Sequence, residues 1–411
     1  MRKGQFEARL LLLVSFGLVA FGLVMVYSAT SASAALANGD PAYYVKRQVL
    51  YALLGLALMV ALARFRFVRL RPLAPALVAT SLGLLVAVLV LGAAVNGARR
   101  WITLGPVVFQ PSEYAKLALA VWAAAYLARR RAPETLRELW RPIGALTCVY
   151  AVLLLLEPDL GTAIAIFVML AGMLLVAGTP VRPLATGLSL ATAIGLAAIW
   201  MEPYRRARVF AFLNPWHDAQ GAGYQIVQAM IGLGSGGPFG VGLGQSVGKA
   251  NYLPEAHTDM IFAVIGEELG LVGTAALIAA YVTFAYVGLR IALRCRDPFG
   301  KALASALTIL VCGQAAINLA AVMGLAPLTG IPLPFVSYGG SSLIVALAAV
   351  GILLNIAVGH GGEARAGMPD RSRRNGRSRP AGARGRRGAA GPRRPSELRR
   401  VAGSNRSAAR S

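Results

Sequence analysis

Long runs of apolar residues, separated by short polar connections, recur along most of the chain. Ten of these runs are predicted to be membrane-spanning helices, because about 20 mostly apolar residues are needed to cross the hydrocarbon core of a bilayer. They lie near residues 10–27, 47–63, 73–95, 113–128, 143–156, 161–178, 183–200, 259–289, 302–324 and 341–358. The pattern therefore predicts an all-α polytopic membrane protein with about ten transmembrane helices, in a membrane domain over residues 10–358.

Basic residues set the predicted orientation of these helices. Arginine and lysine concentrate in the connections that follow the second, fourth and eighth spans. These residues are Arg64, Arg66, Arg69, Arg71, Arg129, Arg130, Arg131, Arg137, Arg141, Arg290, Arg294, Arg296 and Lys301. If the N-terminal residues 1–9 are cytoplasmic, all three connections are cytoplasmic, as the positive-inside bias requires. An even number of spans then places the C-terminus in the cytoplasm as well.

Residues 359–411 hold a large share of the net charge of +24. This tail consists mainly of Gly, Ala, Ser, Pro and Arg, and it has too few large apolar residues to build a core, so we expect it to be disordered. We interpret it as a solvated segment that fixes topology, and contact with anionic lipids or an acidic partner is the alternative. Nucleic acid binding is disfavoured, because no aromatic residues are interleaved for base stacking.

A large outer loop, residues 201–258, is predicted between the seventh and eighth spans. Connections of this length in compact domains are usually functional. Four basic residues lie in it against the positive-inside bias: Arg205, Arg206, Arg208 and Lys249. They indicate either an anionic ligand or a basic anchor at the membrane interface, with the ligand favoured for Lys249. The glycine run at 234–244 favours close packing or a tight turn over phosphate binding.

The end of this loop carries the densest group of ionisable side chains. Lys249, Glu255, His257 and Asp259 fall within eleven residues, directly before an apolar segment. Ionisable groups at a membrane boundary are functional candidates by default, and we expect the chemistry here. If residues 255–259 are helical, Glu255 and Asp259 share a face, and their like charges raise one pKa. His257 is a candidate second base, although a structural role is favoured.

Charged and polar residues also mark the eighth and ninth spans. Glu267 and Glu268 lie about two turns beyond Asp259. We interpret these two glutamates as structural or cavity-lining rather than catalytic. Gln314 and Asn318 are four residues apart on the ninth span, and interhelical hydrogen bonding is their expected role.

Two further outer loops carry polar residues near membrane depth. The sequence from Gln110 to Glu113 predicts a helix start, and Lys116 follows Glu113 by three residues. This pair either satisfies itself or lines a water-filled cavity, and we favour the cavity. The segment 327–342 contains three prolines and paired glycines, which exclude regular helix. Irregular backbone at this depth must be buried in protein or line a cavity.

Several motifs, in one order, resemble the shape, elongation, division and sporulation (SEDS) family of bacterial wall polymerases, the FtsW/RodA/SpoVE group. The matching stretches are 100–102, 109–113, 223–225, 253–259, 266–270 and 332–342. The resemblance covers about residues 9–358 and leaves out the tail. Met260 stands where the family usually has Phe, which exchanges one apolar residue for another. The stretch from Pro254 to Asp259, with the later Gly-Glu-Glu, is more like the division member than the elongation member.

The resemblance implies a peptidoglycan glycosyltransferase that polymerises lipid II at the outer face of the bacterial cytoplasmic membrane. It implies septal wall synthesis during cell division, together with a class B penicillin-binding protein and other membrane proteins of the division complex. It also implies an inverting reaction with undecaprenyl pyrophosphate as the leaving group. The family's functional aspartate corresponds to Asp259.

The residues themselves suggest roles in such a reaction. Asp259 is the candidate general base for the acceptor hydroxyl, or a ligand of a divalent cation such as Mg²⁺ or Mn²⁺, and the sequence leaves both roles open. Cations facing the pyrophosphate would stabilise the leaving group. The predicted substrate-binding residues are Lys249, Glu255, Lys116, Glu113, Arg205, Arg208, Gln225, Ser337 and Ser341. No organic cofactor is expected.

Two other functions compete with this interpretation. A transporter that moves lipid II across the bilayer fits ten spans, but the charged motifs concentrate on the outer side, and no inverted repeat is evident. A scaffold that only recruits partners leaves the group between Lys249 and Asp259 unexplained.

Overall fold

The computed structural model describes residues 3–36, 40–95, 98–105, 107–201, 203–249 and 253–359. The chain divides into two units, Met1–Ala366 and Gly367–Ser411. The second unit lies outside the described residues, and so does the predicted tail from residue 360 onward. The description below concerns the first unit.

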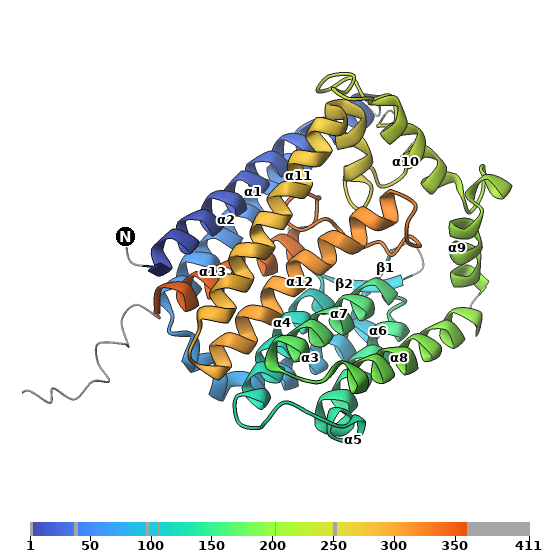
Figure 1. Cartoon of the computed structure of the whole chain (residues 1–411). Coiled ribbons are helices and arrows are strands. Elements are labelled where there is room, and N and C mark those ends of the chain that lie inside the picture. Colours follow the sequence, from blue (N-terminus) through green and yellow to red (C-terminus); the bar gives the residue numbers. More distant parts are fainter. Residues whose placement is uncertain are drawn as a thin grey trace, which may run out of the picture. The chain divides into compact units, whose positions relative to one another are not determined.

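A helix is present at each of the ten predicted spans (Figure 1). These helices are α1 (Lys3–Leu36), α2 (Tyr43–Arg64), α3 (Leu70–Leu91), α4 (Pro111–Leu127), α6 (Ala145–Leu156), α7 (Leu160–Ala177), α8 (Val181–Met201), α11 (Ile261–Arg294), α12 (Pro298–Val322) and α13 (Gly340–Gly359). The remaining helical elements are η1 (Phe67–Arg69), α5 (Leu136–Leu139), η2 (Trp140–Gly144), α9 (Pro203–Leu213), η3 (Pro215–Asp218) and α10 (Tyr224–Ser235).

Nine helical segments in the described part of the chain are long and apolar enough to cross a membrane. The fifth predicted span is among them, because α5 and η2 extend α6 to 21 residues, Leu136–Leu156. The fourth predicted span, α4, is not among the nine, because it has 17 residues. It packs against α3, α7, α12 and α13, and most of its side chains are buried, so α4 lies inside the bundle.

The centre of the bundle is formed by α13, which packs along α2 and also contacts α1, α4 and α12. Small residues let the two central helices approach closely. A Cβ atom on Gly351 of α13 would lie 2.5 Å from the carbonyl oxygen of Met59 in α2. A Cβ atom on Gly55 of α2 would lie 2.6 Å from Leu347. Neither position has room for a side chain unless one of the helices moves.

The eighth predicted span is a broken helix. Gly270 interrupts α11 with φ 64° and ψ −160°, a backbone conformation that favours glycine. A Cβ atom there would lie 2.4 Å from the backbone nitrogen of Gly240. The backbone nitrogens of Val241 and Gly242 donate to the carbonyls of Glu267 and Glu268, each at 3.0 Å. The glycine run therefore packs against the break, and residues 261–269 form a separate outer half-helix.

A small sheet was not predicted. The third predicted span, 73–95, was too long at its end: α3 stops at Leu91, and residues 93–95 form a strand instead. This strand and two strands from the following connection make a three-stranded antiparallel sheet in the order β1-β2-β3. The strands are β1 (Ala93–Val95), β2 (Ala98–Leu104) and β3 (Val107–Phe109). Gly105, with φ 61°, lies at the turn between β2 and β3, and the flanking residues include the β-branched Ile102, Thr103 and Val108. The described fold is otherwise all α.

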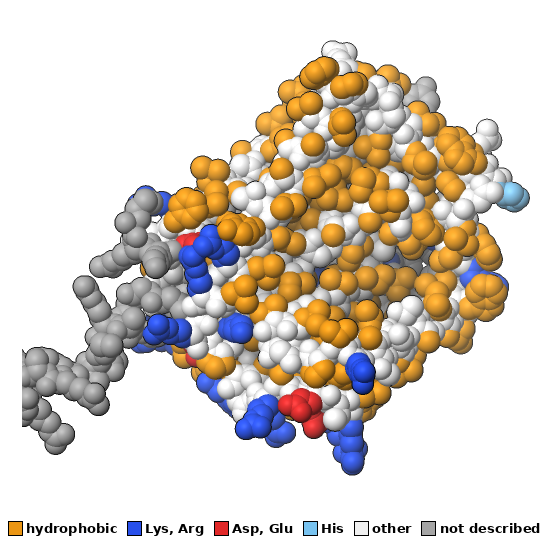
Figure 2. Space-filling model, in the orientation of Figure 1, with side chains coloured by type: hydrophobic (Ala, Val, Ile, Leu, Met, Phe, Trp, Pro, Cys, Tyr) orange, Lys and Arg blue, Asp and Glu red, His pale blue; other side chains and the backbone are white. Residues whose placement is uncertain are grey.

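The two ends of the bundle differ in charge. We call the end that carries residues 40–42, 92–95, 98–105, 107–116, 203–249, 253–268 and 323–339 the outer end, and the end that carries 64–69, 128–144 and 294–297 the basic end. Exposed arginines of the basic end are Arg64, Arg66, Arg69, Arg129, Arg130, Arg131, Arg137, Arg141, Arg294 and Arg296. In Figure 2 most blue side chains lie along the left and the bottom of the molecule, from the end of α13 to the region of α5 in Figure 1, and apolar side chains cover much of the remaining face.

Candidate active site

Asp259 lies in a turn just before the outer half-helix of α11. Residues 254–260 form turns rather than a helix, and Glu255 adopts φ 56°. The Thr258 hydroxyl donates to Glu255 Oε2 at 2.9 Å and to Asp259 Oδ1 at 3.3 Å. Glu255 and Asp259 therefore share a tight turn instead of the helical face considered from the sequence.

The environment of Asp259 keeps its carboxyl group partly exposed and raises its pKa to about 6. Burial is the main cause, and the negative charge of Glu255 also raises the pKa. Arg208 and the Thr258 hydroxyl act in the opposite direction. A carboxyl group with this pKa is mostly ionised at neutral pH, yet it is a stronger base than an ordinary aspartate.

The loop between α12 and α13 lies beside the Asp259 carboxyl group. A Cβ atom on Gly330, which has φ 69°, would lie 4.0 Å from Asp259 Oδ2. The backbone nitrogen of Tyr338 donates to the carbonyl of His257 at 2.9 Å. Asn318 of α12 also donates to the Asp259 carbonyl at 2.7 Å. Two loops far apart in the sequence therefore frame the aspartate.

His257 has the structural role that was favoured. Its ring packs against those of Tyr44 and Tyr338, with centroids 4.6 and 5.5 Å away, and the two tyrosine rings contact each other at 5.1 Å. Burial lowers the pKa of His257, and the nearby Glu255 opposes that shift. The aromatic contacts hold the 254–260 turn against α2 and the loop before α13.

Residues of α9 and α10 flank the same turn. Arg208 of α9 donates to the Leu328 carbonyl at 3.4 Å, and its charge acts on Asp259. Gln225, in the first turn of α10, donates to the Pro254 carbonyl at 3.3 Å. Arg205 lies in α9, and its side chain falls outside the described part of the chain. Arg208, Gln225, Glu255 and Asp259 are thus brought together.

Lys249 belongs to a second, buried cluster. Its ammonium group lies 2.9 Å from Glu268 Oε1 and 3.3 Å from the Ser28 hydroxyl of α1. The neighbouring Glu267 accepts from the Ser246 hydroxyl and from the backbone nitrogen of Val247. Both glutamates therefore bind the outer loop to the half-helix, in agreement with their predicted structural role. The proposed role of Lys249 in ligand binding stays a prediction, since its ammonium already has an anionic partner.

Glu113 and Lys116 form the local pair that was the alternative to a cavity-lining face. The Lys116 ammonium lies 2.6 Å from Glu113 Oε1, and the two side chains are 0% and 4% exposed. Their predicted contact with substrate would require water or ligand to reach this pair from the outer end. That role stays a prediction.

Ser337 and Ser341 organise the irregular outer backbone. The Ser337 hydroxyl accepts from the Leu333 nitrogen at 2.8 Å. The Ser341 hydroxyl accepts from the Gln110 nitrogen at 2.9 Å and donates to the Val108 carbonyl at 3.2 Å. The Ser337 bond closes the loop before α13 on itself, and the Ser341 bonds join the first turn of α13 to β3 and to the start of α4. Substrate contact by either serine stays a prediction.

Two acidic residues between α6 and α7, Glu157 and Asp159, were not among the residues predicted from the sequence to have a role. Asp159 accepts from the Thr162 nitrogen at 3.1 Å and from the Ser112 hydroxyl at 3.1 Å, so it caps α7 and joins it to α4. Glu157 is fully buried, and neither carboxyl oxygen has a hydrogen-bond partner among the described residues. Burial, and then the charge of Asp159, raise its pKa to about 8. A Glu-Pro-Asp sequence ending an apolar span was the available signal.

The acidic groups suit a cation that is shared with substrate. No set of three or more His, Cys, Asp or Glu side chains that could hold a metal ion occurs among the described residues. Asp259 and Glu255 offer carboxylate oxygens, which Mg²⁺ and Mn²⁺ prefer. Mg²⁺ is commonly held by one or two carboxylates together with substrate phosphates, and this donor set fits that mode.

The chain matches the family model described as cell cycle protein, FtsW/RodA/SpoVE, over residues 8–360. A probable peptidoglycan glycosyltransferase FtsW of Nitrosococcus halophilus is 43% identical over 352 residues, which are 84% of this chain and 91% of that protein. The protein of the same description from Shewanella sediminis is 40% identical over 358 residues, 86% of this chain and 87% of that protein.

Solved structures share this architecture. A chain from a structure on the coordination of polymerization and crosslinking by a peptidoglycan synthase complex matches with a TM-score of 0.72 and 33% identity, covering 85% of this chain and 97% of that chain. The rod shape determining protein RodA of Thermus thermophilus matches with a TM-score of 0.63 and 32% identity, covering 85% of this chain and 95% of that chain.

Proposed function

The chain belongs to the FtsW/RodA/SpoVE family, and on this premise we propose that it is a peptidoglycan glycosyltransferase of septal wall synthesis. It is a multi-pass membrane protein of the cytoplasmic membrane, and it joins lipid II units into glycan strands at the outer face. The observation that carries this proposal is Asp259, a partly exposed carboxyl group framed by two outer loops, with a pKa of about 6.

In the proposed reaction Asp259 acts as a general base. Its carboxylate removes the proton from the 4-hydroxyl group of the acceptor sugar as that oxygen attacks C1 of the donor sugar. The bond from C1 to the pyrophosphate oxygen breaks, and undecaprenyl pyrophosphate leaves with the electron pair. Configuration at C1 inverts in this single displacement, and no covalent enzyme intermediate forms. General base catalysis of this kind contributes about 10²–10⁴-fold in rate.

The leaving pyrophosphate requires positive charge. Arg208 of α9 acts electrostatically on Asp259 and is the described candidate, with Arg205 on the same helix. In the alternative role of Asp259, this carboxylate and Glu255 would hold a divalent cation, which would stabilise the leaving group when bound. We expect removal of divalent cations with EDTA to suppress polymer formation, and we expect Mg²⁺ or Mn²⁺ to restore it.

A class B penicillin-binding protein is the proposed partner, since polymerised glycan must be cross-linked. A family relative with 33% identity is a chain of a peptidoglycan synthase complex. Much of α8 is exposed, and so is part of the outer loop, including Phe239 and Val247. Such apolar surfaces suit contacts with lipid and with a membrane-anchored partner.

The decisive experiment is polymer formation from purified lipid II in proteoliposomes. The full chain, co-purified with its class B partner, is supplied with Mg²⁺ and compared with Asp259→Asn. The matched control is Asp40→Asn, which changes an exposed acidic residue paired with Lys46. We expect glycan strands from the wild type and the control, and almost none from Asp259→Asn.

The same vesicles separate the competing functions. A transporter would move labelled lipid II between leaflets without forming polymer. A scaffold would neither move lipid II between leaflets nor form polymer. Asp259→Asn would leave its recruitment of partners unchanged. Absence of polymer from the wild type, with the partner shown to be bound, would contradict the proposed function.

A further inference from the structure

Asn318 of α12 makes two hydrogen bonds that meet at the candidate active site. Its Nδ2 atom donates to the carbonyl of Asp259 at 2.7 Å and to the carbonyl of Ile331 at 2.8 Å. The side chain is only 2% exposed. One amide group therefore joins three segments: α12, the turn that carries Asp259, and the loop that contains Gly330.

The orientation of this amide is fixed by its partners. Both partners are carbonyl oxygens, so only the NH₂ side of the amide can face them. The Oδ1 atom is then left buried without a partner among the described residues. An unpartnered buried acceptor is unfavourable for folding, because it loses its hydrogen bonds to water and gains none in return. Local costs of this kind are characteristic of functional sites.

The two bonds control where the Asp259 carboxyl group lies. The first holds the backbone of Asp259, from which its side chain projects. The second holds Ile331, next to Gly330, whose Cβ position would lie 4.0 Å from Asp259 Oδ2. Neither segment is helical, so each has few hydrogen bonds of its own. Loss of the amide would free both the aspartate and the loop facing it.

We propose that Asn318 is a positioning residue for the glycosyl transfer reaction, and that it sets the relative placement of Asp259 and the 329–331 loop. This inference rests on the proposed function. The residue does not contact the reacting atoms in this account. Misplacement of a catalytic group by about 1 Å can lower the rate by about 100-fold, even when substrate binding persists.

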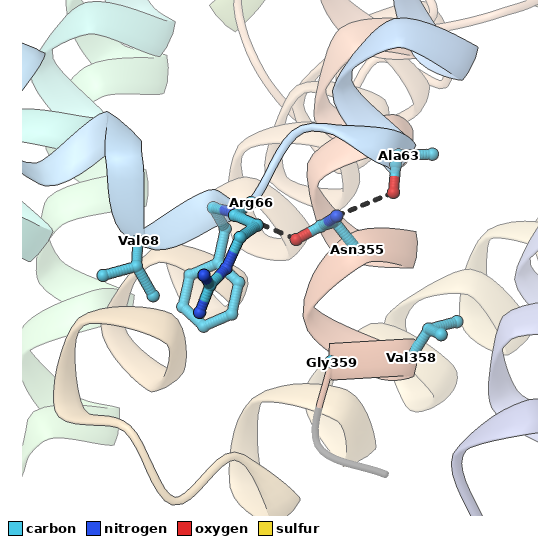
Figure 3. A pocket seen from close by; sticks show the side chains of 7 residues that line it. Ala63, Arg66, Val68, Asn355, Val358 and Gly359 are labelled. Atoms are coloured by element: carbon cyan, nitrogen blue, oxygen red, sulfur yellow. Dashed lines mark hydrogen bonds between the residues drawn. The ribbon is translucent and has the colours of Figure 1, made fainter. Parts of the chain in front are cut away.

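Asn355 offers a matched control at the basic end of the molecule. Its Nδ2 atom donates to the Ala63 carbonyl at 2.7 Å, and its Oδ1 atom accepts from the Phe67 nitrogen at 3.0 Å (Figure 3). It thus also joins three segments through two bonds: α13, the end of α2 and the start of η1. Asn355 borders a pocket of about 160 Å³ with Ala63, Arg66, Phe67, Val68, Val358 and Gly359.

The experiment compares Asn318→Ala with Asn355→Ala in the full chain with its partner. The kcat and KM for lipid II polymerisation are measured, together with thermal unfolding in detergent. We expect both variants to unfold at lower temperature than the wild type. We expect kcat to fall by about 10–100-fold only in Asn318→Ala, with KM changed less than about threefold, because the loss is in orientation rather than binding.

A second variant covers the case in which Asn318→Ala does not fold. Asn318→Ser retains one hydroxyl donor. If both variants fold, we expect the kcat of Asn318→Ser to lie between those of the wild type and Asn318→Ala. If only Asn318→Ser folds, we expect its kcat to lie clearly below that of the wild type. The inference is overturned if the kcat of the Asn318 variants matches that of Asn355→Ala, or if the loss appears in KM alone. Failure of the wild type to polymerise would instead refute the proposed function.

Discussion

The outer end and the basic end of this protein use charged residues in opposite ways. At the outer end Lys249, Glu268 and Lys116 are buried, and each is bonded to a specific partner. At the basic end, arginines such as Arg129 and Arg130 are exposed. Exposed arginines in short connections follow the positive-inside bias, which acts on membrane orientation. Buried pairs instead fix the geometry of the segments they join.

The comparison shows that the position of a charge, rather than its type, indicates its role. Asp40 and Asp259 both lie at the outer end, yet Asp40 forms an exposed pair with Lys46 at 2.7 Å. Asp259 is only partly exposed and has a raised pKa. A partly buried, incompletely compensated carboxyl group is suited to accept a proton, whereas an exposed paired one is not.

Among the substitutions at the two ends, we expect replacement of Asp259 to have the largest effect on activity. Asp259→Asn keeps the side-chain size but removes the base, and we expect the rate of polymerisation to fall by about 10²–10⁴-fold. The measurement is the initial rate of glycan formation at saturating lipid II. Asp40→Asn should keep the wild-type rate, and a comparable loss in both variants would show that any outer carboxylate suffices.

The buried pair at the half-helix should have the next largest effect, on stability. Lys249→Met leaves Glu268 buried without its cation, and we expect a loss of about 3–5 kcal/mol in the free energy of unfolding. Denaturant unfolding in detergent measures this loss. The double variant Lys249→Met with Glu268→Gln should recover part of it, because no buried charge is left unpaired.

The exposed pair at the same end provides the contrast. Lys46→Met should leave the unfolding transition nearly unchanged, since exposed ion pairs are screened by water. Equal destabilisation by Lys46→Met and Lys249→Met would show that burial does not distinguish the two pairs.

A smaller effect concerns pH. The charge of Glu255 disfavours ionised Asp259 and raises its pKa, so Glu255→Gln should lower that pKa. Because the base must be ionised, the rate in the wild type should rise as pH increases through about 6. In Glu255→Gln this rise should occur at lower pH, as measured by kcat between pH 5 and 8. A shift toward higher pH would contradict the assigned cause.

The smallest effect should come from the basic end. Arg130→Ala removes an exposed charge far from the outer loops, and we expect kcat of the correctly inserted protein to remain within about twofold of the wild type. The measurement is the rate of polymerisation in proteoliposomes, divided by the amount of protein that is inserted in the correct orientation. A large loss of kcat would show that this end also takes part in the reaction.

The hydrophobic pattern predicted most of the fold, because each span must satisfy its backbone hydrogen bonds internally and is therefore helical. All ten predicted spans contain helix. The sequence does not decide whether the eighth span breaks at Gly270, since a glycine in an apolar run permits either a straight helix or a kink. Only its contact with Gly240 decides between them. The sheet at 93–109 was missed because its strands are short and depend on pairing with each other.

The candidate site was predicted in its main residue but not in its partners. The motif around Asp259 was evident, and the structure brings Arg208 and Glu255 to it. Asn318 was expected only to bond between helices, because its two carbonyl partners lie 59 and 13 residues away in the sequence. The pairing of Lys249 with Glu268 could not be predicted either, because the sequence does not define the path of the turn between them.

The most direct test of the central claim is the pH dependence of the chemical step. Bound lipid II is allowed to react once with wild type and with Asp259→Asn, and the rate is measured from pH 5 to 8. Asp259 as the base predicts a wild-type rate that rises through about pH 6 and a variant rate that is low and independent of pH. A variant that keeps the wild-type rate and profile would contradict the assignment of Asp259 as the base.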